Sequence, residues 1–221
     1  MAGRFITFEG LDGSGKSTHL QAVAAALAHR RVPHLVTHEP GGTPLADAIR
    51  RIFLDPRWGE VDGVVELMLM FASRRQHLVE RIDPALAAGT VVLCDRFTDS
   101  TYAYQGHGRG VPLDVIARLD ELATGGRRPD LTLLFDLPAA EARRRGHSPA
   151  RRGRGACDRL DSEDVAFYER VRQGFLARAA AEPERFRLVD SSGSREQTAA
   201  HVRAALGELP AAPAVGGEAG A

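Results

Sequence analysis

The chain has 221 residues, of which 43% are hydrophobic, and its 29 acidic residues balance its 29 lysine and arginine residues. This length supports one substantial core, and the balance of charge leaves no overall field to attract nucleic acid or a membrane surface. The two cysteines lie far apart without metal-site spacing, and no apolar run is long enough to span a bilayer. We therefore expect a cytoplasmic protein without a disulfide framework.

Short apolar strands alternate with helical segments along the chain. The expected strands are residues 4–9, 34–38, 90–95, 131–136 and 186–190. The expected helices are residues 18–30, 43–54 (with Thr43 as the N-cap), 61–81, 84–88, 112–124, 162–181 and 194–209. This alternation is typical of a parallel sheet covered by helices on both faces. We predict an α/β fold in one domain over residues 1–209, followed by a disordered tail over residues 210–221.

The first strand leads into a glycine-rich loop. Residues 10–17 read Gly-Leu-Asp-Gly-Ser-Gly-Lys-Ser, the G-x-x-x-x-G-K-[ST] pattern that presents backbone N–H groups and a helix N-terminus to phosphate. Lys16 is the only lysine of the chain, which marks a place where arginine cannot serve, because a planar guanidinium is too wide to fit between phosphate oxygens. The residues predicted to bind ATP are Gly10, Asp12, Gly13, Ser14, Gly15, Lys16, Ser17 and Thr18.

A second polar pair, Asp95-Arg96, ends the third strand at the sheet edge where ligands bind in such folds. Asp95, together with Ser17, is expected to reach the magnesium ion of the triphosphate, and Arg96 offers a two-donor fork to a second phosphate. A strand-end salt bridge is the alternative explanation, which the neighbouring phosphate loop disfavours. Without any asparagine or a second lysine, the chain lacks the guanine-reading motif of GTPases and the metal-binding asparagine of protein kinases.

Five blocks together resemble bacterial thymidylate kinases. They are GLDGSGKST at 10–18, EPGGTPLADAIR at 39–50, ELMLMFASRRQ at 66–76, DRFTDSTYAYQG at 95–106 and RPDLTLLFD at 128–136. The resemblance runs in order over roughly residues 4–206. It implies a five-stranded parallel sheet of the P-loop NTPase type with a small arginine-rich lid. It also implies a homodimer and the reaction of ATP with dTMP to give ADP and dTDP, a step of dTTP synthesis.

The acceptor of such a reaction is a phosphate monoester, which is already an anionic nucleophile. Transfer to it needs arginines and one magnesium ion to neutralise two mutually repelling anions, rather than a general base. By resemblance, Arg50 and Arg96 hold the acceptor phosphate. Asp12 positions the arginine partners of that phosphate or the metal, which is compatible with stabilising its own turn. Glu39 anchors its loop at the acceptor site or has a purely structural part.

Selection of the base is expected from two helices. Phe71 and Arg75 are four residues apart and so lie on one helical face. An aromatic ring there can stack on a base, and the arginine can donate to thymine O4, where cytosine presents an amino donor instead. For Phe71 alone, a buried core position is the alternative.

A second helical pair, Thr101 and Gln105, is suited to the remaining edge of the base, with Ser100 nearby. Tyr104 matches the sugar-side tyrosine of the family, which crowds a ribose 2′-hydroxyl. Together with Phe71 and Arg75, these residues are expected to make the site specific for dTMP.

An arginine-rich segment over approximately residues 143–160 is expected to form the lid. The phosphate loop carries no arginine between its glycines, and relatives with such loops supply that charge from the lid, where Arg152 and Arg154 match best. Arg151 or Arg145 is the alternative. Glu163 matches a family glutamate near the metal, with an acid stabilised by the helix dipole as the alternative. A charge run of this kind is otherwise a solvated or nucleic-acid-binding surface.

Two other functions fit a phosphate loop. A deoxynucleoside kinase, or a kinase of another monophosphate, is the closer alternative; a neutral hydroxyl acceptor would call for a carboxylate base near Arg96. A regulatory P-loop ATPase is the alternative from another class, and it would need a water-positioning residue and an effector surface, neither of which is recognisable in the sequence.

Overall fold

The computed structural model describes residues 3–146 and 159–207. Five strands form one parallel sheet in the order β2-β3-β1-β4-β5, which confirms the predicted fold class. The strands are β1 (Phe5–Gly10), β2 (His34–His38), β3 (Val91–Asp95), β4 (Leu131–Asp136) and β5 (Phe186–Asp190). Because β1 lies between β3 and β4, the loops that follow these three strands meet at one edge of the sheet.

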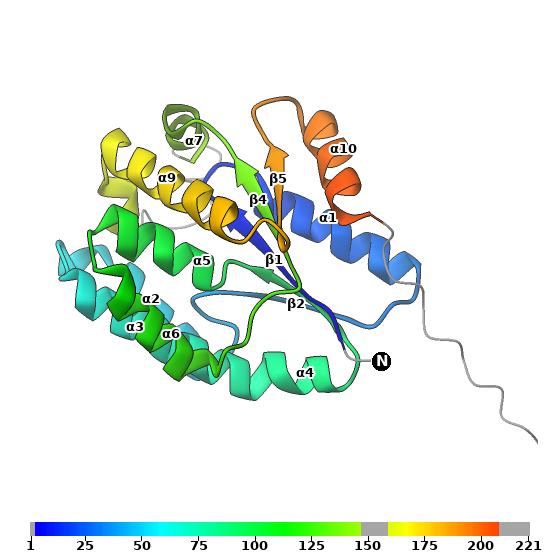
Figure 1. The fold of residues 1–221 in the computed structure, drawn as a ribbon, viewed down its shortest axis with the longest axis horizontal. Coiled ribbons are helices and arrows are strands. Elements are labelled where there is room, and N and C mark those ends of the chain that lie inside the picture. The colour runs from blue at the N-terminus through cyan, green and yellow to red at the C-terminus, as the bar shows by residue number, and fades with distance from the viewer. Residues whose placement is uncertain (1–2, 147–158, 208–221) are drawn as a thin grey trace, which may run out of the picture.

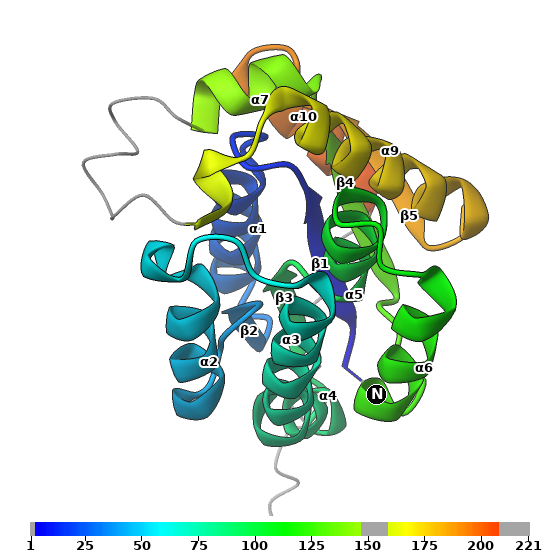
Figure 2. The same cartoon turned by 90° about the vertical axis from the view of Figure 1, so that its left-hand side faces the viewer.

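Helices cover both faces of the sheet (Figure 1). They are α1 (Lys16–His29), α2 (Pro44–Leu54), α3 (Gly63–His77), α4 (Asp83–Ala87), α5 (Thr98–Thr101), α6 (Leu113–Thr124), α7 (Ala139–Gly146), α9 (Val165–Ala181) and α10 (Arg195–Leu206). On one face, Ile6 and Phe8 of β1 pack with Leu27 of α1 in a core that α10 completes. On the other face lie α4, α5 and α9. Figure 2 shows α2 and α3 as neighbours, and α3 also packs on α6.

The strands carry apolar side chains toward both faces, as expected for a parallel sheet that is buried on both sides. In β1 the alternate positions Thr7 and Glu9 are polar and point to the face covered by α5 and α9. Thr7 is satisfied there by a hydrogen bond of 2.8 Å to Thr132 of β4. The carboxylate of Glu9 lies immediately before the phosphate loop, where it becomes part of the site.

Several predicted helix boundaries shift. The segments predicted as 61–81 and 84–88 join into one rod, because a wider, π-helical turn over Leu78–Ile82 links α3 to α4. The helix predicted from residue 162 begins at Val165, since the Asp164 carboxylate accepts the Phe167 N–H at 2.7 Å and caps it.

Helix α7 was not predicted, and it contains the first residues assigned to the lid. Arg144 and Arg145 both donate to Glu141, at 2.7 and 2.6 Å, which stabilises the helix through neighbouring turns. Arg145 also donates to the backbone oxygen of Ser191 at 2.8 Å, which ties α7 to the loop after β5. The first residues of the predicted lid, 143–146, are therefore helical in the structure, and Arg145 contacts the loop after β5.

Among the described residues, every helix is too short or too polar to cross a membrane. Residues 210–221, predicted as a disordered tail, lie outside the described part of the chain.

Candidate active site

The phosphate loop joins the carboxyl end of β1 to the first turn of α1, as the motif predicts. Gly13 and Gly15 have φ angles of 86° and 85°, in the left-handed region that favours glycine. A Cβ on Gly13 would collide with the backbone oxygen of Ala142, so this position is also closed to other residues by space. Lys16 is buried within the loop, and its Nζ donates to Oδ1 of Asp12 at 3.2 Å.

Oxygen atoms from the loop and from the end of β3 gather beside α1. The Ser17 hydroxyl donates to Oδ2 of Asp95. The other carboxylate oxygen of Asp95 and the Ser14 hydroxyl are buried without a hydrogen-bond partner in the described part of the chain. Mg²⁺ binds oxygen ligands, keeps several waters and takes one or two ligands from the protein beside substrate phosphates. This donor set fits Mg²⁺, although the described residues hold no cluster of three or more His, Cys, Asp or Glu side chains.

Arg96 lies across from the loop and connects it to α5. Its NH2 group donates to Oδ1 of Asp12 at 2.9 Å, and its NH1 group donates to the Ser100 hydroxyl at 2.9 Å. Its guanidinium stacks 5.1 Å from the ring centre of Tyr104, whose hydroxyl lies 3.3 Å from NH2. Arg50 lies in the same region of the sheet edge, where its NH1 group donates to the Pro40 oxygen at 2.9 Å. Arg96 thus contacts the phosphate loop through Asp12, and its role in holding a second phosphate stays a prediction.

A buried group of side chains surrounds Arg74 on the inner side of α3. Arg74 donates to Glu39 at 2.7 Å and to the Thr101 hydroxyl at 3.0 Å, and its guanidinium lies 5.0 Å from the ring centre of Phe71. His77 holds the second oxygen of Glu39 at 3.1 Å. Burial alone would raise the pKa of Glu39, but Arg74 and His77 outweigh it and hold that pKa below its usual value. The contacts of Glu39 place it as the anchor of Arg74.

The structure does not bring Arg75 into this group. Arg75 is exposed, and its NH1 group donates to the backbone oxygen of Ala123 on α6 at 3.3 Å. Positions three and four residues after Phe71 both lie on its side of a helix, so spacing alone could not separate Arg74 from Arg75. The correction is that Arg74, and not Arg75, accompanies Phe71.

Gln105 and Tyr104 lie in a π-helical stretch, Tyr102–Gly108, that continues α5. Gln105 donates from Nε2 to the buried carboxylate of Glu66 at 2.9 Å, while Thr101 contacts Arg74. Tyr104 is buried as well, and burial raises the pKa of its hydroxyl well above the usual value. The predicted pair of Thr101 and Gln105 therefore lies in two adjoining clusters, because the wider turn changes the α-helical spacing.

Glu163 lies in a different cluster from Asp95 and Ser17. Its carboxylate pairs with Arg109 at 2.7 Å, and Arg109 in turn donates to Glu66 at 3.2 Å. No described contact joins Glu163 to the proposed metal ligands. The predicted lid arginines, Arg152 and Arg154, lie outside the described residues.

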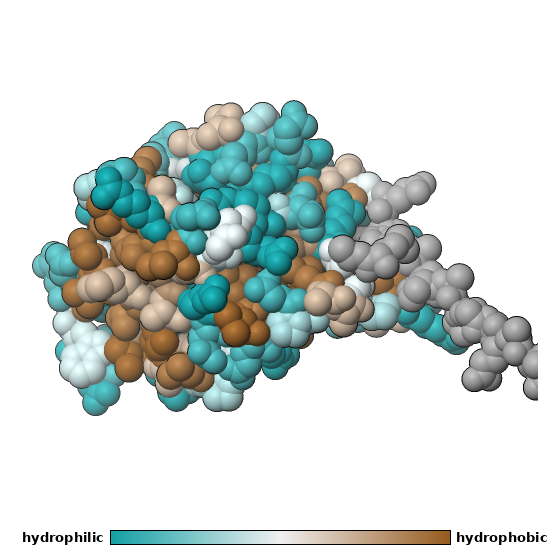
Figure 3. Space-filling view, turned by 60° about the horizontal axis from the view of Figure 1, so that its bottom comes forward, coloured by the Kyte–Doolittle hydropathy of each residue, from teal (hydrophilic) through white to brown (hydrophobic). Residues whose placement is uncertain are grey.

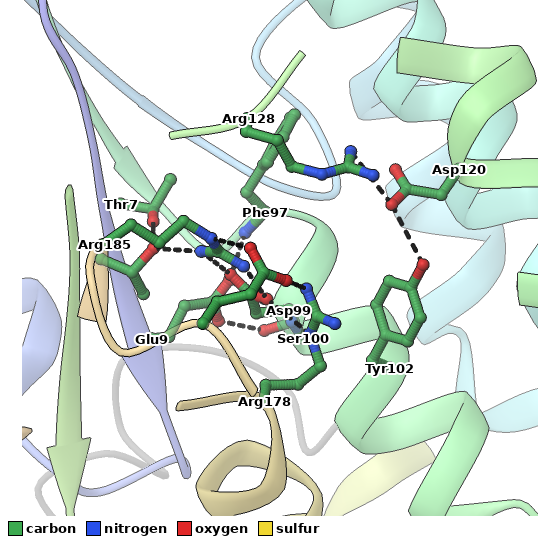
Figure 4. A network of polar contacts seen from close by, with 12 residues as sticks. Thr7, Glu9, Phe97, Asp99, Ser100, Tyr102, Asp120, Arg128, Arg178 and Arg185 are labelled. Atoms are coloured by element: carbon green, nitrogen blue, oxygen red, sulfur yellow. Dashed lines mark hydrogen bonds and ion pairs between the residues drawn. The ribbon is translucent and has the colours of Figure 1, made fainter. Parts of the chain in front are cut away.

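Sequence reasoning missed Glu9. Its Oε1 accepts the N–H groups of Phe97 at 2.7 Å and Ser100 at 3.3 Å, and its Oε2 accepts the Ser100 hydroxyl at 2.6 Å (Figure 4). Burial, followed by the charge of Asp99, raises the pKa of Glu9 to about 7, although Arg96 and these hydrogen bonds act in the opposite direction. The available signal was an acidic residue in an otherwise apolar strand directly before the glycine loop.

A buried lysine in a glycine loop, an acid and a serine beside it, and an arginine on the facing side define a P-loop phosphotransferase that brings two phosphate groups together. The comparisons with known proteins agree. The family model for thymidylate kinase matches residues 8–202. A thymidylate kinase of Pseudomonas fluorescens (strain SBW25) is 50% identical over 209 residues, which cover 95% of each chain.

Two further relatives extend the comparison. A thymidylate kinase of Pseudomonas putida (strain GB-1) is 48% identical over 206 residues, covering 93% of this chain and 96% of the relative. The crystal structure of thymidylate kinase from Ehrlichia chaffeensis matches with a TM-score of 0.68 and 34% identity, over 86% of this chain and 93% of that one. The chain belongs to the thymidylate kinase family. Its activity is the ATP-dependent phosphorylation of dTMP to dTDP.

Proposed function

We propose that the transfer takes place where the phosphate loop faces Arg96, with ATP on the loop and the dTMP phosphate on Arg96 and Arg50. One observation carries this assignment: Lys16 and Arg96 both bond to the same oxygen of Asp12, at 3.2 and 2.9 Å. A single carboxylate oxygen thus lies between a cation of the ATP side and a cation of the acceptor side. This spacing suits two phosphate groups that must meet in line.

The chain contributes charge and position rather than a general base. The acceptor phosphate oxygen is the nucleophile, and no proton has to be removed before it attacks. On the donor side, Lys16 and the N–H groups of the loop hold the ATP phosphates, with Ser14 and Thr18 completing the loop. Asp12 holds Lys16 and Arg96 at the right separation before the phosphates bind. We include Arg152 and Arg154 as the source of further positive charge at the transferred phosphoryl group.

Asp95 and Ser17 are the residues we propose for Mg²⁺. When bound there with ATP, the ion would neutralise charge on phosphate oxygens. The unpartnered, buried oxygen of Asp95 supports this proposal. Glu163, paired with Arg109, is left as a more distant candidate.

For the base of dTMP we propose the ring of Phe71 as the stacking surface and Arg74 as the donor to thymine O4. A guanidinium has five N–H donors, and the described contacts of Arg74 use three of them, on Glu39, Thr101 and the Phe97 oxygen. The remaining donors suit a carbonyl oxygen. Tyr104, beside Arg96, is proposed to lie next to the sugar.

A homodimer is the proposed assembly, formed through the outer face of α2, α3 and α6. Exposed apolar side chains gather there, and Figure 3 shows a broad apolar area on this side of the molecule. They include Leu45, Ile52, Val65, Met68 and Leu122, which are between 42% and 77% exposed. Contiguous apolar patches of this kind mark interaction sites. We place the enzyme in the cytoplasm, where ATP is found, without a nucleic-acid partner.

Light scattering after size-exclusion chromatography tests the dimer. The Met68→Glu variant should elute with the mass of a monomer. Leu188→Glu changes another exposed apolar residue, on β5, and should keep the mass of a dimer. A parent protein with the mass of a monomer at micromolar concentration would contradict the proposed assembly.

Calorimetric titration with dTMP and with thymidine tests the assignment of the acceptor phosphate. Arg96→Gln should weaken dTMP binding by about tenfold or more and leave thymidine binding nearly unchanged, because only dTMP carries the phosphate. Arg187→Gln, at an exposed arginine of β5, is the control and should bind both ligands as the parent does. An equal loss for both ligands would show that Arg96 acts elsewhere.

A further inference from the structure

The carboxylate of Glu9 links the strand before the phosphate loop to the segment after β3. It is fully buried, and the donors that it accepts all come from the residues that follow Arg96. These donors are the N–H groups of Phe97 and Ser100 and the Ser100 hydroxyl. Figure 4 shows Glu9 pointing toward Phe97 and Ser100.

The Ser100 hydroxyl stands between Glu9 and Arg96. It lies 2.6 Å from Oε2 of Glu9 and 2.9 Å from NH1 of Arg96. An arginine only donates hydrogen bonds, and an ionised carboxylate only accepts them. When Glu9 is ionised, the single proton of Ser100 must therefore point to Glu9, which leaves the lone pairs of the hydroxyl for Arg96. The order of donors and acceptors along this chain is fixed by the charge on Glu9.

Glu9 also supports the backbone conformation at Arg96. Its φ angle is 72°, in the left-handed region that is costly for a residue with a side chain. The next N–H group, of Phe97, is held by Glu9 at 2.7 Å, and the N–H of Arg96 itself donates to the Phe8 oxygen at 3.0 Å. Glu9 thus fixes both the backbone after Arg96 and one end of its guanidinium.

A second buried acid beside Glu9 is neutralised separately. Asp99 receives two hydrogen bonds from Arg185, at 2.7 and 2.8 Å, and one from Arg178 at 3.0 Å. Figure 4 shows both arginines directed at Asp99, while Glu9 is directed at Ser100. The positive charges of Arg178 and Arg185 beside Asp99 reduce the repulsion between the carboxylates of Asp99 and Glu9. Glu9 can therefore accept hydrogen bonds from Ser100 and Phe97.

We propose that Glu9 is a positioning residue for the kinase reaction, which acts through Ser100 to orient Arg96 toward the acceptor phosphate. The proposal rests on the role of Arg96 stated under Proposed function. In this arrangement Glu9 does not touch either substrate. Its replacement should therefore affect the binding of the acceptor phosphate selectively, and not the binding of thymidine or ATP.

The first test compares Glu9→Gln with the parent by calorimetric titration of dTMP, thymidine and ATP. Glutamine has nearly the same shape, but its amide group donates hydrogen bonds, so the Ser100 proton is turned toward Arg96. We expect dTMP affinity to fall by about tenfold or more, with thymidine and ATP affinities within about twofold of the parent. Glu182→Gln changes an acid at the outer end of the same network, next to Arg178 and Arg185, and should leave all three affinities unchanged. Equal losses for all three ligands in Glu9→Gln would overturn the proposal.

A double-mutant cycle with Ser100 isolates the connection. In a Ser100→Ala background the path to Arg96 is already broken, so adding Glu9→Gln should change dTMP affinity by less than about twofold. If the two changes instead multiply, Glu9 acts independently of Ser100 and the proposal is wrong. Ser100→Thr keeps a hydroxyl and should retain most of the affinity.

Two outcomes separate this inference from the proposed function beneath it. If Arg96→Gln loses dTMP affinity and Glu9→Gln does not, only the inference fails. If Arg96→Gln itself keeps dTMP affinity, the proposed acceptor site fails. If Glu9→Gln does not fold, Ser100→Ala is compared with Ser100→Thr. A loss of dTMP affinity in Ser100→Ala, without a loss of thymidine affinity and restored in Ser100→Thr, supports the proposal. Equal dTMP affinities in the two variants, or a matching loss of thymidine affinity in Ser100→Ala, overturn it.

Discussion

Arg96 and Asp12 are 84 residues apart in the sequence, yet the guanidinium of Arg96 donates to Oδ1 of Asp12 at 2.9 Å. Lys16 approaches the same oxygen at 3.2 Å, so one carboxylate holds a cation from each side of the site. We expect phosphate groups bound at the proposed site to compete with Asp12 for these cations. Before substrates bind, the carboxylate of Asp12 thus pairs with both of these cations.

The single lysine is the first point to test. Lys16→Arg keeps the charge, and we expect turnover to fall by on the order of a hundredfold or more, because the guanidinium cannot occupy the position of the ammonium between phosphate oxygens. Arg187→Lys makes the opposite exchange at an exposed position and should be neutral. Steady-state kinetics with dTMP and Mg-ATP measures both. Near-normal turnover in Lys16→Arg would remove the argument from the lone lysine.

Recognition of the base should depend on Arg74 and not on its neighbour. Arg74→Lys keeps the ion pair with Glu39 but loses the planar fork, so we expect a higher KM for dTMP and a smaller preference for dTMP over dCMP. Arg75→Lys is the matched control, and its dTMP/dCMP ratio should stay within about twofold of the parent. If the ratio changes with Arg75 and not with Arg74, the structural assignment is wrong and the assignment from helical spacing is restored.

Local patterns predicted the sheet and the loop well, because their signals lie within a few residues. The buried strand 131–136 and the glycine loop carry their own composition, and both form as expected. Local patterns could not show which of two adjacent residues faces the site. Arg74 and Arg75 differ only in which of them meets Glu39, a residue 35 positions from Arg74.

The residues that the sequence did not reveal depend on distant partners. Glu9 is defined by Ser100, 91 positions away, and nothing in the strand around Glu9 points to that partner. Helix α7 was not predicted because its arginines were assigned to the lid, while the contacts of Arg145 run to Glu141 and, 46 positions away, to Ser191. Such contacts follow from the strand order of the sheet, which the sequence pattern does not specify.

Magnesium dependence should follow Asp95. Asp95→Asn removes one negative charge from the proposed ligand, and we expect the Mg²⁺ concentration for half-maximal activity to rise by roughly tenfold or more. Asp190→Asn makes the same change at the end of β5, where the Asp190 carboxylate accepts hydrogen bonds from Ser192, and it should have no effect. Titration of activity with Mg²⁺ at saturating ATP distinguishes them. The same Mg²⁺ dependence in Asp95→Asn and the parent would exclude Asp95 as a ligand.

The free energy of unfolding should depend on pH through the protonation of Glu9. Burial and then Asp99 raise the pKa of Glu9 from 4.5 to about 7. Because the folded pKa is above the unfolded one, the contribution of Glu9 to the free energy of unfolding is complete below about pH 4.5 and is lost as the pH rises through about 7.

Comparison with Glu9→Gln isolates this contribution from the other titrating groups. The free energy of unfolding of the parent, minus that of the variant, should decrease by on the order of 3 kcal/mol between about pH 4.5 and about pH 8. Urea denaturation at a series of pH values measures it. A difference that is constant with pH would show that the pKa of Glu9 is the same in the folded and unfolded chains.

The most direct test of the account is a coupled ADP-release assay with Mg-ATP and a panel of acceptors: dTMP, dUMP, dCMP, AMP and thymidine. The proposed site predicts the highest kcat/KM for dTMP, because we propose that Arg96 binds the acceptor phosphate and that Phe71 and Arg74 bind the thymine base. The value for dUMP should be lower, since it lacks the methyl contact, and dCMP, AMP and thymidine should be poor acceptors. A higher kcat/KM for thymidine than for dTMP would contradict the account.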